Sequence, residues 1–138
     1  MLKQFDQFVN YPDFAKLFLR LSLGCLMLLH GIHKVQPDGL KGIEAMLTNV
    51  GVPTFIAYGV LIGEIVCPVL IILGIFTRVA ALIVALTMGV AVVLIHGSDI
   101  FFLNNATGGW GVESAGLFFL VALSIMFQGS GRFTLIKD

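Results

Sequence analysis

The sequence predicts an all-α integral membrane protein, a four-helix bundle with a short amphipathic helix at the membrane interface between its first two spans. Hydrophobic residues make up 58% of the 138 residues, charged residues only 12%, and the mean hydropathy is +1.02. Soluble domains rarely reach such values. The third observation is a series of four apolar runs, of the length that crosses a hydrocarbon core of about 30 Å as a helix.

The four predicted spans fill most of the chain and leave room only for short connections. They cover residues 14–34, 53–76, 78–97 and 110–127. We therefore expect one domain, residues 1–138, without a separate soluble catalytic domain. Any chemistry must then take place inside or beside the helix bundle.

The first span is interpreted as a retained signal anchor, because no strongly basic leader precedes it and no small-residue cleavage site follows Leu29. Four spans place both termini on the same side. Cations on the terminal side outnumber those on the opposite side, which predicts that both termini are cytoplasmic. The two sets are Lys3, Lys16, Arg20, Arg78, Arg132 and Lys137 against Lys34 and Lys41.

The net charge argues against nucleic acid as a partner. The formal net charge is +0, and Lys and Arg occur singly rather than in clusters. Such a chain offers no basic surface for a phosphate backbone. The expected partner of most of its surface is the lipid bilayer.

The connections on the outer side are longer than the turn at Thr77 and Arg78. Between Asp38, a plausible N-cap, and Gly51, a plausible stop, apolar residues recur at helical spacing. They are Leu40, Ile43, Met46, Leu47 and Val50. This pattern predicts the short interfacial helix. Residues 98–109 carry a second apolar run and are interpreted either as a lid over the bundle or as an interfacial anchor.

Small residues in the second and third spans predict close helix packing. Gly59 and Gly63 form a Gly-x-x-x-Gly pair, and Ala81, Ala85 and Gly89 repeat the same spacing. These positions are assigned to packing rather than to chemistry.

The two cysteines argue against a disulfide relay. Cys25 and Cys67 stand singly on separate spans, without a Cys-x-x-Cys motif. We interpret both as buried packing residues.

Glu64 is the most informative residue, because it lies near the middle of the apolar run 53–76. Ionisable residues at such depth are costly and usually pair or mark a functional path. Counting along antiparallel helices places Arg20 roughly 21 Å and Glu64 roughly 16 Å below the outer end. We therefore expect an ion pair between them, either structural or part of a ligand-binding or proton-transfer site.

A second polar cluster is predicted at the outer end of the bundle. His30 and His33 are three residues apart, His96 ends the third span, and Glu113 begins the fourth, with Trp110 at the same level. Imidazole beside carboxylate suits proton exchange near neutral pH. The same groups suit a transition metal or, for paired histidines, haem, and the alternative is a set of solvated interfacial residues.

The chain resembles the DoxX/DoxD family of small four-helix membrane proteins over nearly its whole length. The resemblance rests on residues in a shared order, each short motif being weak alone. They are Arg20, Gly31 with Lys34, Glu64, Gly74-Ile-Phe-Thr-Arg78, Glu113 and the tail Gly129-Ser-Gly131-Arg-Phe-Thr-Leu. The tail departs from the family pattern at Ile136-Lys137, where an aspartate is common.

What this resemblance implies is a bundle in the bacterial inner membrane, acting as a subunit of a redox system. Some relatives belong to a thiosulfate:quinone oxidoreductase, which suggests quinone as the cofactor and a redox partner protein as electron donor; a homo-oligomer is compatible with the sequence. The candidate catalytic residues are Glu64, Arg20, His30 and Glu113, and the candidate cofactor-binding residues are His30, His96, Trp110 and Lys34. No metal is assigned in this interpretation.

Two alternatives stay open at this point. In one, the protein binds or transports a metal or small solute through His30, His96 and Glu113, with Glu64 on the path. In the other, it is a membrane anchor without a ligand.

Overall fold

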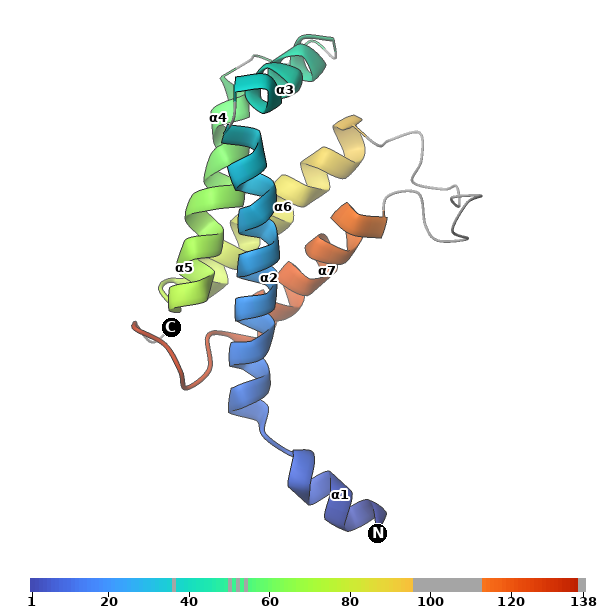
Figure 1. Ribbon diagram of the computed structural model, residues 1–138, viewed down its shortest axis with the longest axis vertical. Coiled ribbons are helices and arrows are strands. Elements are labelled where there is room, and N and C mark those ends of the chain that lie inside the picture. Colours follow the sequence, from blue (N-terminus) through green and yellow to red (C-terminus); the bar gives the residue numbers. More distant parts are fainter. Residues whose placement is uncertain (36, 50, 52, 54, 96–112, 137–138) are drawn as a thin grey trace.

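The computed structural model describes residues 1–35, 37–49, 51, 53, 55–95 and 113–136, and these form helices joined by short segments, without a strand (Figure 1). The prediction of an all-α fold is confirmed. The elements in chain order are α1 (Leu2–Val9), α2 (Pro12–Val35), α3 (Pro37–Asn49), α4 (Ile56–Leu61), the π-helical turn η1 (Ile62–Val66), α5 (Cys67–Leu73), α6 (Thr77–Ile95) and α7 (Glu113–Gln128).

The segments α4, η1 and α5 follow one another without a break and form one long rod (Figure 1). This rod packs against α2 on one side and α6 on another, while α6 packs extensively against α7, and α7 returns to α2. The shared core is apolar, with contributions from each of the four long elements, and includes Leu23, Met27, Ile71, Val84, Met88 and Ile125. The residue ranges of the four packed rods overlap those of the four predicted spans, and that all four cross a membrane stays a prediction.

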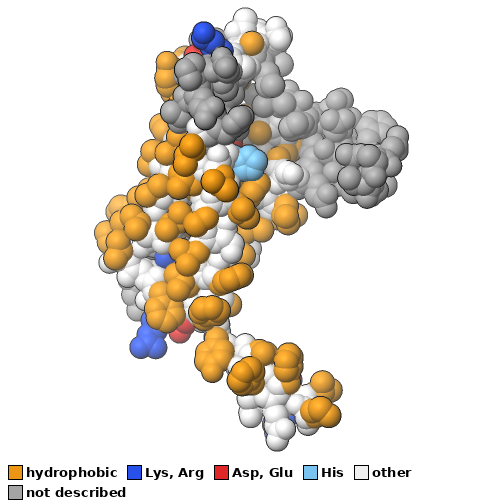
Figure 2. All heavy atoms as spheres, viewed as in Figure 1, with side chains coloured by type: hydrophobic (Ala, Val, Ile, Leu, Met, Phe, Trp, Pro, Cys, Tyr) orange, Lys and Arg blue, Asp and Glu red, His pale blue; other side chains and the backbone are white. Residues whose placement is uncertain are grey.

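Two helical stretches of the described chain are long and apolar enough to cross a membrane, Pro12–Ile32 and Ile56–Leu73. The stretches Thr77–Val93 and Ser114–Gln128 are apolar but shorter. Hydrophobic side chains cover most of the visible flank of the bundle (Figure 2). An outer surface this apolar is typical of helices that face lipid rather than water.

The predicted amphipathic helix is present as α3, and it ends close to the predicted stop. Gly51 has a positive φ of 76° and its N–H donates to the carbonyl of Thr48 at 3.1 Å. Leu47 is buried against Ala57 of α4. At least one apolar residue of α3 therefore packs on protein, and its placement at the membrane interface stays a prediction.

Sequence analysis missed α1, which precedes α2 and extends away from the bundle (Figure 1). Its apolar residues Leu2, Phe5 and Phe8 are exposed in the structure. The run is only eight residues long, which is too short for periodicity to separate it from a loop.

The predicted packing residues divide into two groups. Gly63 lies against the Thr87 side chain of α6, and Ala81 and Ala85 are buried, so close packing is confirmed for these positions. The prediction for Gly59 is wrong, because no atom lies within 4 Å of the place where its Cβ would be. Gly59 therefore faces away from the neighbouring helices.

Candidate functional site

Glu64 lies at the centre of η1, in the middle of the second long rod, and its side chain is 1% exposed. The cause of the π-helical turn is visible in the sequence. Pro68 has no N–H with which to meet the carbonyl of Glu64 four residues earlier, and its ring crowds that carbonyl. The N–H of Cys67 instead donates to the carbonyl of Ile62, five residues back. Such single π turns are frequent at functional sites.

Gly31 of α2 lies against the backbone of Glu64. A Cβ at Gly31 would stand 2.8 Å from the carbonyl carbon of Glu64 and 2.6 Å from Cγ1 of Ile65, closer than side chains tolerate. The helices meet closely only because residue 31 is glycine. Gly24, two turns earlier on α2, makes a similar approach, because a Cβ there would stand 3.0 Å from the carbonyl oxygen of Pro68.

A third helix closes the other side of this turn. Gly63, next to Glu64, lies against Thr87 of α6, whose hydroxyl donates to the carbonyl of Ile83 at 2.8 Å. The backbone around Glu64 is thus fixed by glycine contacts with both α2 and α6. A carboxylate held in this way has a well-defined position inside an otherwise apolar rod.

His30 lies at the same level as Glu64, because its neighbour Gly31 touches the Glu64 backbone. The exposed His30 side chain meets α7, where its ring packs edge-on against Phe118 with centroids 5.4 Å apart and planes at 82°. The structure therefore brings two of the candidate catalytic residues to one level of the bundle, His30 on α2 and Glu64 on the adjacent η1.

The expected ion pair between Arg20 and Glu64 is wrong. Arg20 precedes Gly31 by eleven residues, so its backbone lies roughly 16 Å along α2 from the level of Glu64. Its guanidinium donates from Nε to the carbonyl of Ile71 at 3.0 Å and from Nη2 to that of Ile72 at 3.2 Å. The expectation assumed that the first two spans begin at the same height, whereas the glycine contacts show that they are offset.

Arg20, 1% exposed, instead joins three segments at the opposite end of the bundle. Besides the two carbonyls of α5, its Nη1 donates to the carbonyls of Ser130 at 2.8 Å and Phe133 at 2.6 Å in the C-terminal tail. The N–H of Leu135 in turn donates to the carbonyl of Leu73 at 3.1 Å. The last carbonyls of α5, which no helical N–H can reach, are satisfied in this way.

Three motifs of the sequence resemblance, namely Arg20, the segment 74–78 and the glycine-rich tail, therefore meet at this end. Gly74, which ends α5 with a positive φ of 75°, lies beside the Arg20 guanidinium and Thr134 of the tail. Arg78 donates from Nη1 to the carbonyls of Met126 at 3.0 Å and Phe127 at 3.2 Å, the last turn of α7. These residues hold the bundle together. Sequence reasoning missed this role because their partners are backbone carbonyls, which every residue type has and which the sequence therefore does not mark.

Several candidate residues fall outside what the structure describes. His96 and Trp110 lie outside the described residues, as does the segment 98–109, and the side chains of His33, Lys34 and Glu113 are likewise outside. The backbone places Lys34 in the last turn of α2 and Glu113 at the start of α7. Within the described portion of the chain, no group of three or more His, Cys, Asp or Glu residues is arranged to hold a metal ion.

The two cysteines differ in their surroundings. Cys67 is buried and Cys25 is exposed, and both are free thiols. The interpretation as a buried packing residue therefore applies to Cys67, and it is wrong for Cys25.

The chain is similar in sequence to known proteins. The DoxX family model matches residues 15–97. The chain is 35% identical over 126 residues to a Haemophilus influenzae protein named "Uncharacterized protein", with 88% of each chain covered. It is 30% identical over 83 residues to the Bacillus subtilis protein named "Putative oxidoreductase CatD", with 60% of each covered. No solved structure matches.

The matched segment contains almost all of α2, the π turn with Glu64, and the whole of α6. Together with the apolar helices, the match indicates a membrane protein. The chain belongs to the DoxX family.

Proposed function

We propose that this protein is a DoxX subunit of a quinone-linked redox system in the bacterial inner membrane, in which Glu64 exchanges protons with the quinone. Family membership and a relative named as an oxidoreductase support a redox role. The observation that carries the proposal is the buried carboxylate of Glu64 on a π turn within an apolar rod. Intramembrane carboxylates of this kind commonly belong to proton paths.

In this proposal the four rods, namely α2, α4 with η1 and α5, α6, and α7, all cross the membrane. The bonds from Arg20 and Arg78 hold the start of α2, the end of α5, the start of α6 and the end of α7 at one end. That end also carries most of the cations of the chain, so the positive-inside rule makes it cytoplasmic. His30 then lies in the outer half of α2, with Glu64 of η1 at the same level and α3 at the outer surface.

Quinone reduction needs two electrons and two protons, and the residues near Glu64 are suited to the protons. A carboxyl group inside the bundle can give a proton to a quinone oxygen, and His30 at the same level can replace it with a proton taken up from the outer surface. The sequence has no dinucleotide fingerprint and no Cys-x-x-Cys motif. The electrons therefore come from a partner protein.

Thermal stability of the purified full-length protein tests the proposal. Short-chain ubiquinone and menaquinone analogues should raise the midpoint of unfolding saturably, because a ligand that binds only the folded state stabilises it, by about 2.7 kcal/mol at one hundred times Kd. Glu64→Gln keeps the size of the side chain and should abolish the shift. Glu44→Gln, a matched change on α3, should keep it.

The outcomes separate the candidates. A shift that persists in Glu64→Gln would place quinone elsewhere on the protein and remove Glu64 from the mechanism. No shift in the folded wild-type protein would reject quinone binding and favour a role as a membrane anchor.

A further inference from the structure

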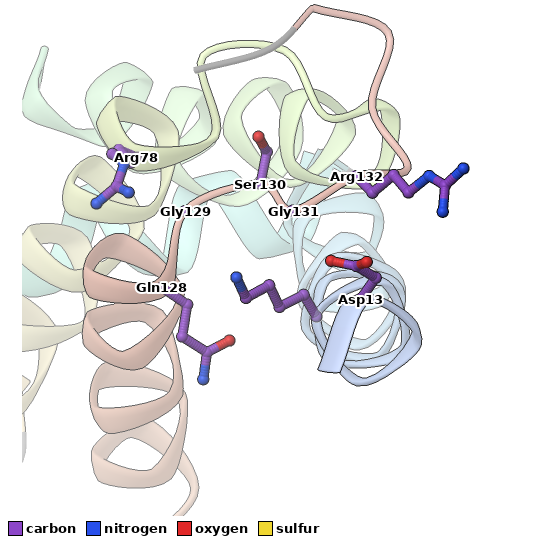
Figure 3. A pocket seen from close by; sticks show the side chains of 8 residues that line it. Asp13, Arg78, Gln128, Gly129, Ser130, Gly131 and Arg132 are labelled. Carbon is purple, nitrogen blue, oxygen red and sulfur yellow. The ribbon is translucent and has the colours of Figure 1, made fainter. Parts of the chain in front are cut away.

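A polar cavity of about 370 Å³ lies at the same end of the bundle as Arg20, far from Glu64. Its lining comes from the start of α2, the start of α6, the end of α7 and the glycine-rich tail, and consists of Asp13, Lys16, Arg78, Gln128, Gly129, Ser130, Gly131 and Arg132. Figure 3 shows the tail running along one wall, with Arg78 and Gln128 on one side and Asp13 and Arg132 on the other.

The lining is positively charged. The lining contains three cationic side chains, Lys16, Arg78 and Arg132, and one carboxylate, Asp13. Arg78 already binds the carbonyls at the end of α7, so its guanidinium is a fixed charge in the wall. Arg132 is exposed, and in Figure 3 its guanidinium extends outward from the tail. A cavity with this excess of positive charge favours an anion.

The tail glycines shape the cavity by letting these cations approach. Gly129 has a φ of 83° and lies against the Arg78 guanidinium, with 3.0 Å between Cζ and the position of a Cβ. Gly131 has a φ of 78°, and a Cβ at this position would stand 3.1 Å from Cβ and Cδ of Lys16. Both glycines adopt a conformation that other residues rarely take. The sequence Gly-Ser-Gly thus lets Arg78 and Lys16 each pack against the tail backbone that lines the cavity.

Three residues that line the cavity are each followed or preceded in the sequence by an exposed phenylalanine. Phe14 follows Asp13, Phe127 precedes Gln128, and Phe133 follows Arg132, with exposed fractions of 58%, 74% and 48%. A cationic cavity beside exposed apolar side chains matches a phospholipid, whose phosphate carries negative charge and whose chains are apolar. A free phosphate ion would use only the cations.

We infer that this cavity binds the phosphate headgroup of an anionic phospholipid, with Lys16 contacting the phosphate, Arg78 contributing a fixed positive charge and the exposed Arg132 attracting the anion from the rim. The acyl chains extend over the apolar outer surface of the bundle. Such a site anchors the end of the bundle to the leaflet that is rich in anionic lipid, which in the proposed orientation is the cytoplasmic one. The inference goes beyond the redox proposal and does not involve Glu64.

Native mass spectrometry of the full-length protein in detergent tests the inference, with dioleoylphosphatidylglycerol as probe and dioleoylphosphatidylcholine as the zwitterionic control. The wild-type protein should retain the anionic lipid in preference. Arg132→Gln and Lys16→Gln should each weaken its binding about fivefold, the usual effect of one interfacial cation. Lys41→Gln, an exposed cation on α3 at the opposite end, should leave binding unchanged.

Equal retention of the two lipids, or wild-type binding by Arg132→Gln, would overturn the inference. Arg132 is exposed, so this variant stays informative even if Lys16→Gln fails to fold. A titration with inorganic phosphate separates the two sources of phosphate. If phosphate displaces no lipid, the lipid assignment is supported; if it binds the cavity more tightly than the lipid does, that assignment is wrong.

Discussion

Gly31 of α2 lies directly against the backbone of Glu64, with no room for a side chain between them. The contact sets the register between α2 and the rod of α4, η1 and α5. It also fixes the position of Glu64, the one buried carboxylate in the described part of that rod. On the other side, Gly63 makes an equally close approach to Thr87 of α6. The position of Glu64 is therefore determined by how closely its helix packs against α2 and α6.

Gly31→Ala should destabilise the protein by about 1–3 kcal/mol, because the added methyl group forces α2 away from Glu64 and Ile65. Thermal unfolding in detergent measures the loss. Gly59→Ala is the matched control, since nothing lies within 4 Å of that position and alanine favours a helix by about 0.5–1 kcal/mol. Equal stability of the two variants would show that the close contact is not needed.

Arg20→Lys should destabilise the protein by about 2–4 kcal/mol although the charge is kept. One ammonium cannot reproduce the fork that reaches two carbonyls of α5 and two of the tail, and each lost bond to a charged group costs about 1.5–3 kcal/mol before compensation. The released tail should also be cleaved faster by trypsin at Arg132. Arg132→Lys keeps a tryptic site on the exposed tail and should match the wild type; slow cleavage in Arg20→Lys would contradict the proposed clamp.

Pro68→Ala should convert the π turn into regular α-helix. The new N–H at residue 68 can meet the carbonyl of Glu64, which proline leaves without its helical donor. A structure of the variant decides the matter, because the Cys67 N–H should move from the carbonyl of Ile62 to that of Gly63. If the bond to Ile62 persists, packing against α2 and α6 rather than Pro68 causes the turn.

His30 variants separate packing from chemistry. His30→Phe keeps an aromatic ring against Phe118 and should retain stability, whereas His30→Ala should lose about 0.5–1.5 kcal/mol. If His30 passes protons to or from the quinone, both variants should lose proton-coupled turnover with the redox partner. Activity that follows stability, and is therefore kept in His30→Phe, would assign His30 a packing role.

The sequence by itself determined every helix except α1, because the others follow from local properties of the chain. Long apolar runs predict α2, the rod of α4, η1 and α5, and the helices α6 and α7, and the spacing of apolar residues before Gly51 predicts α3. The depth of Glu64 within its run also predicts that its carboxylate is buried. The helices can be predicted in this way because their backbone hydrogen bonds are made within one segment of the chain.

Only the tertiary structure decided which residues meet. Counting from Lys34 and Pro53 assumed a common starting height, but the contact of Gly31 with Glu64 offsets the two rods by eight residues, roughly 12 Å. That offset separates Arg20 from Glu64 and brings Arg20 to the tail. Helix register depends on how side chains from distant segments interdigitate and where glycine permits close approach, and neither is encoded within a single apolar run.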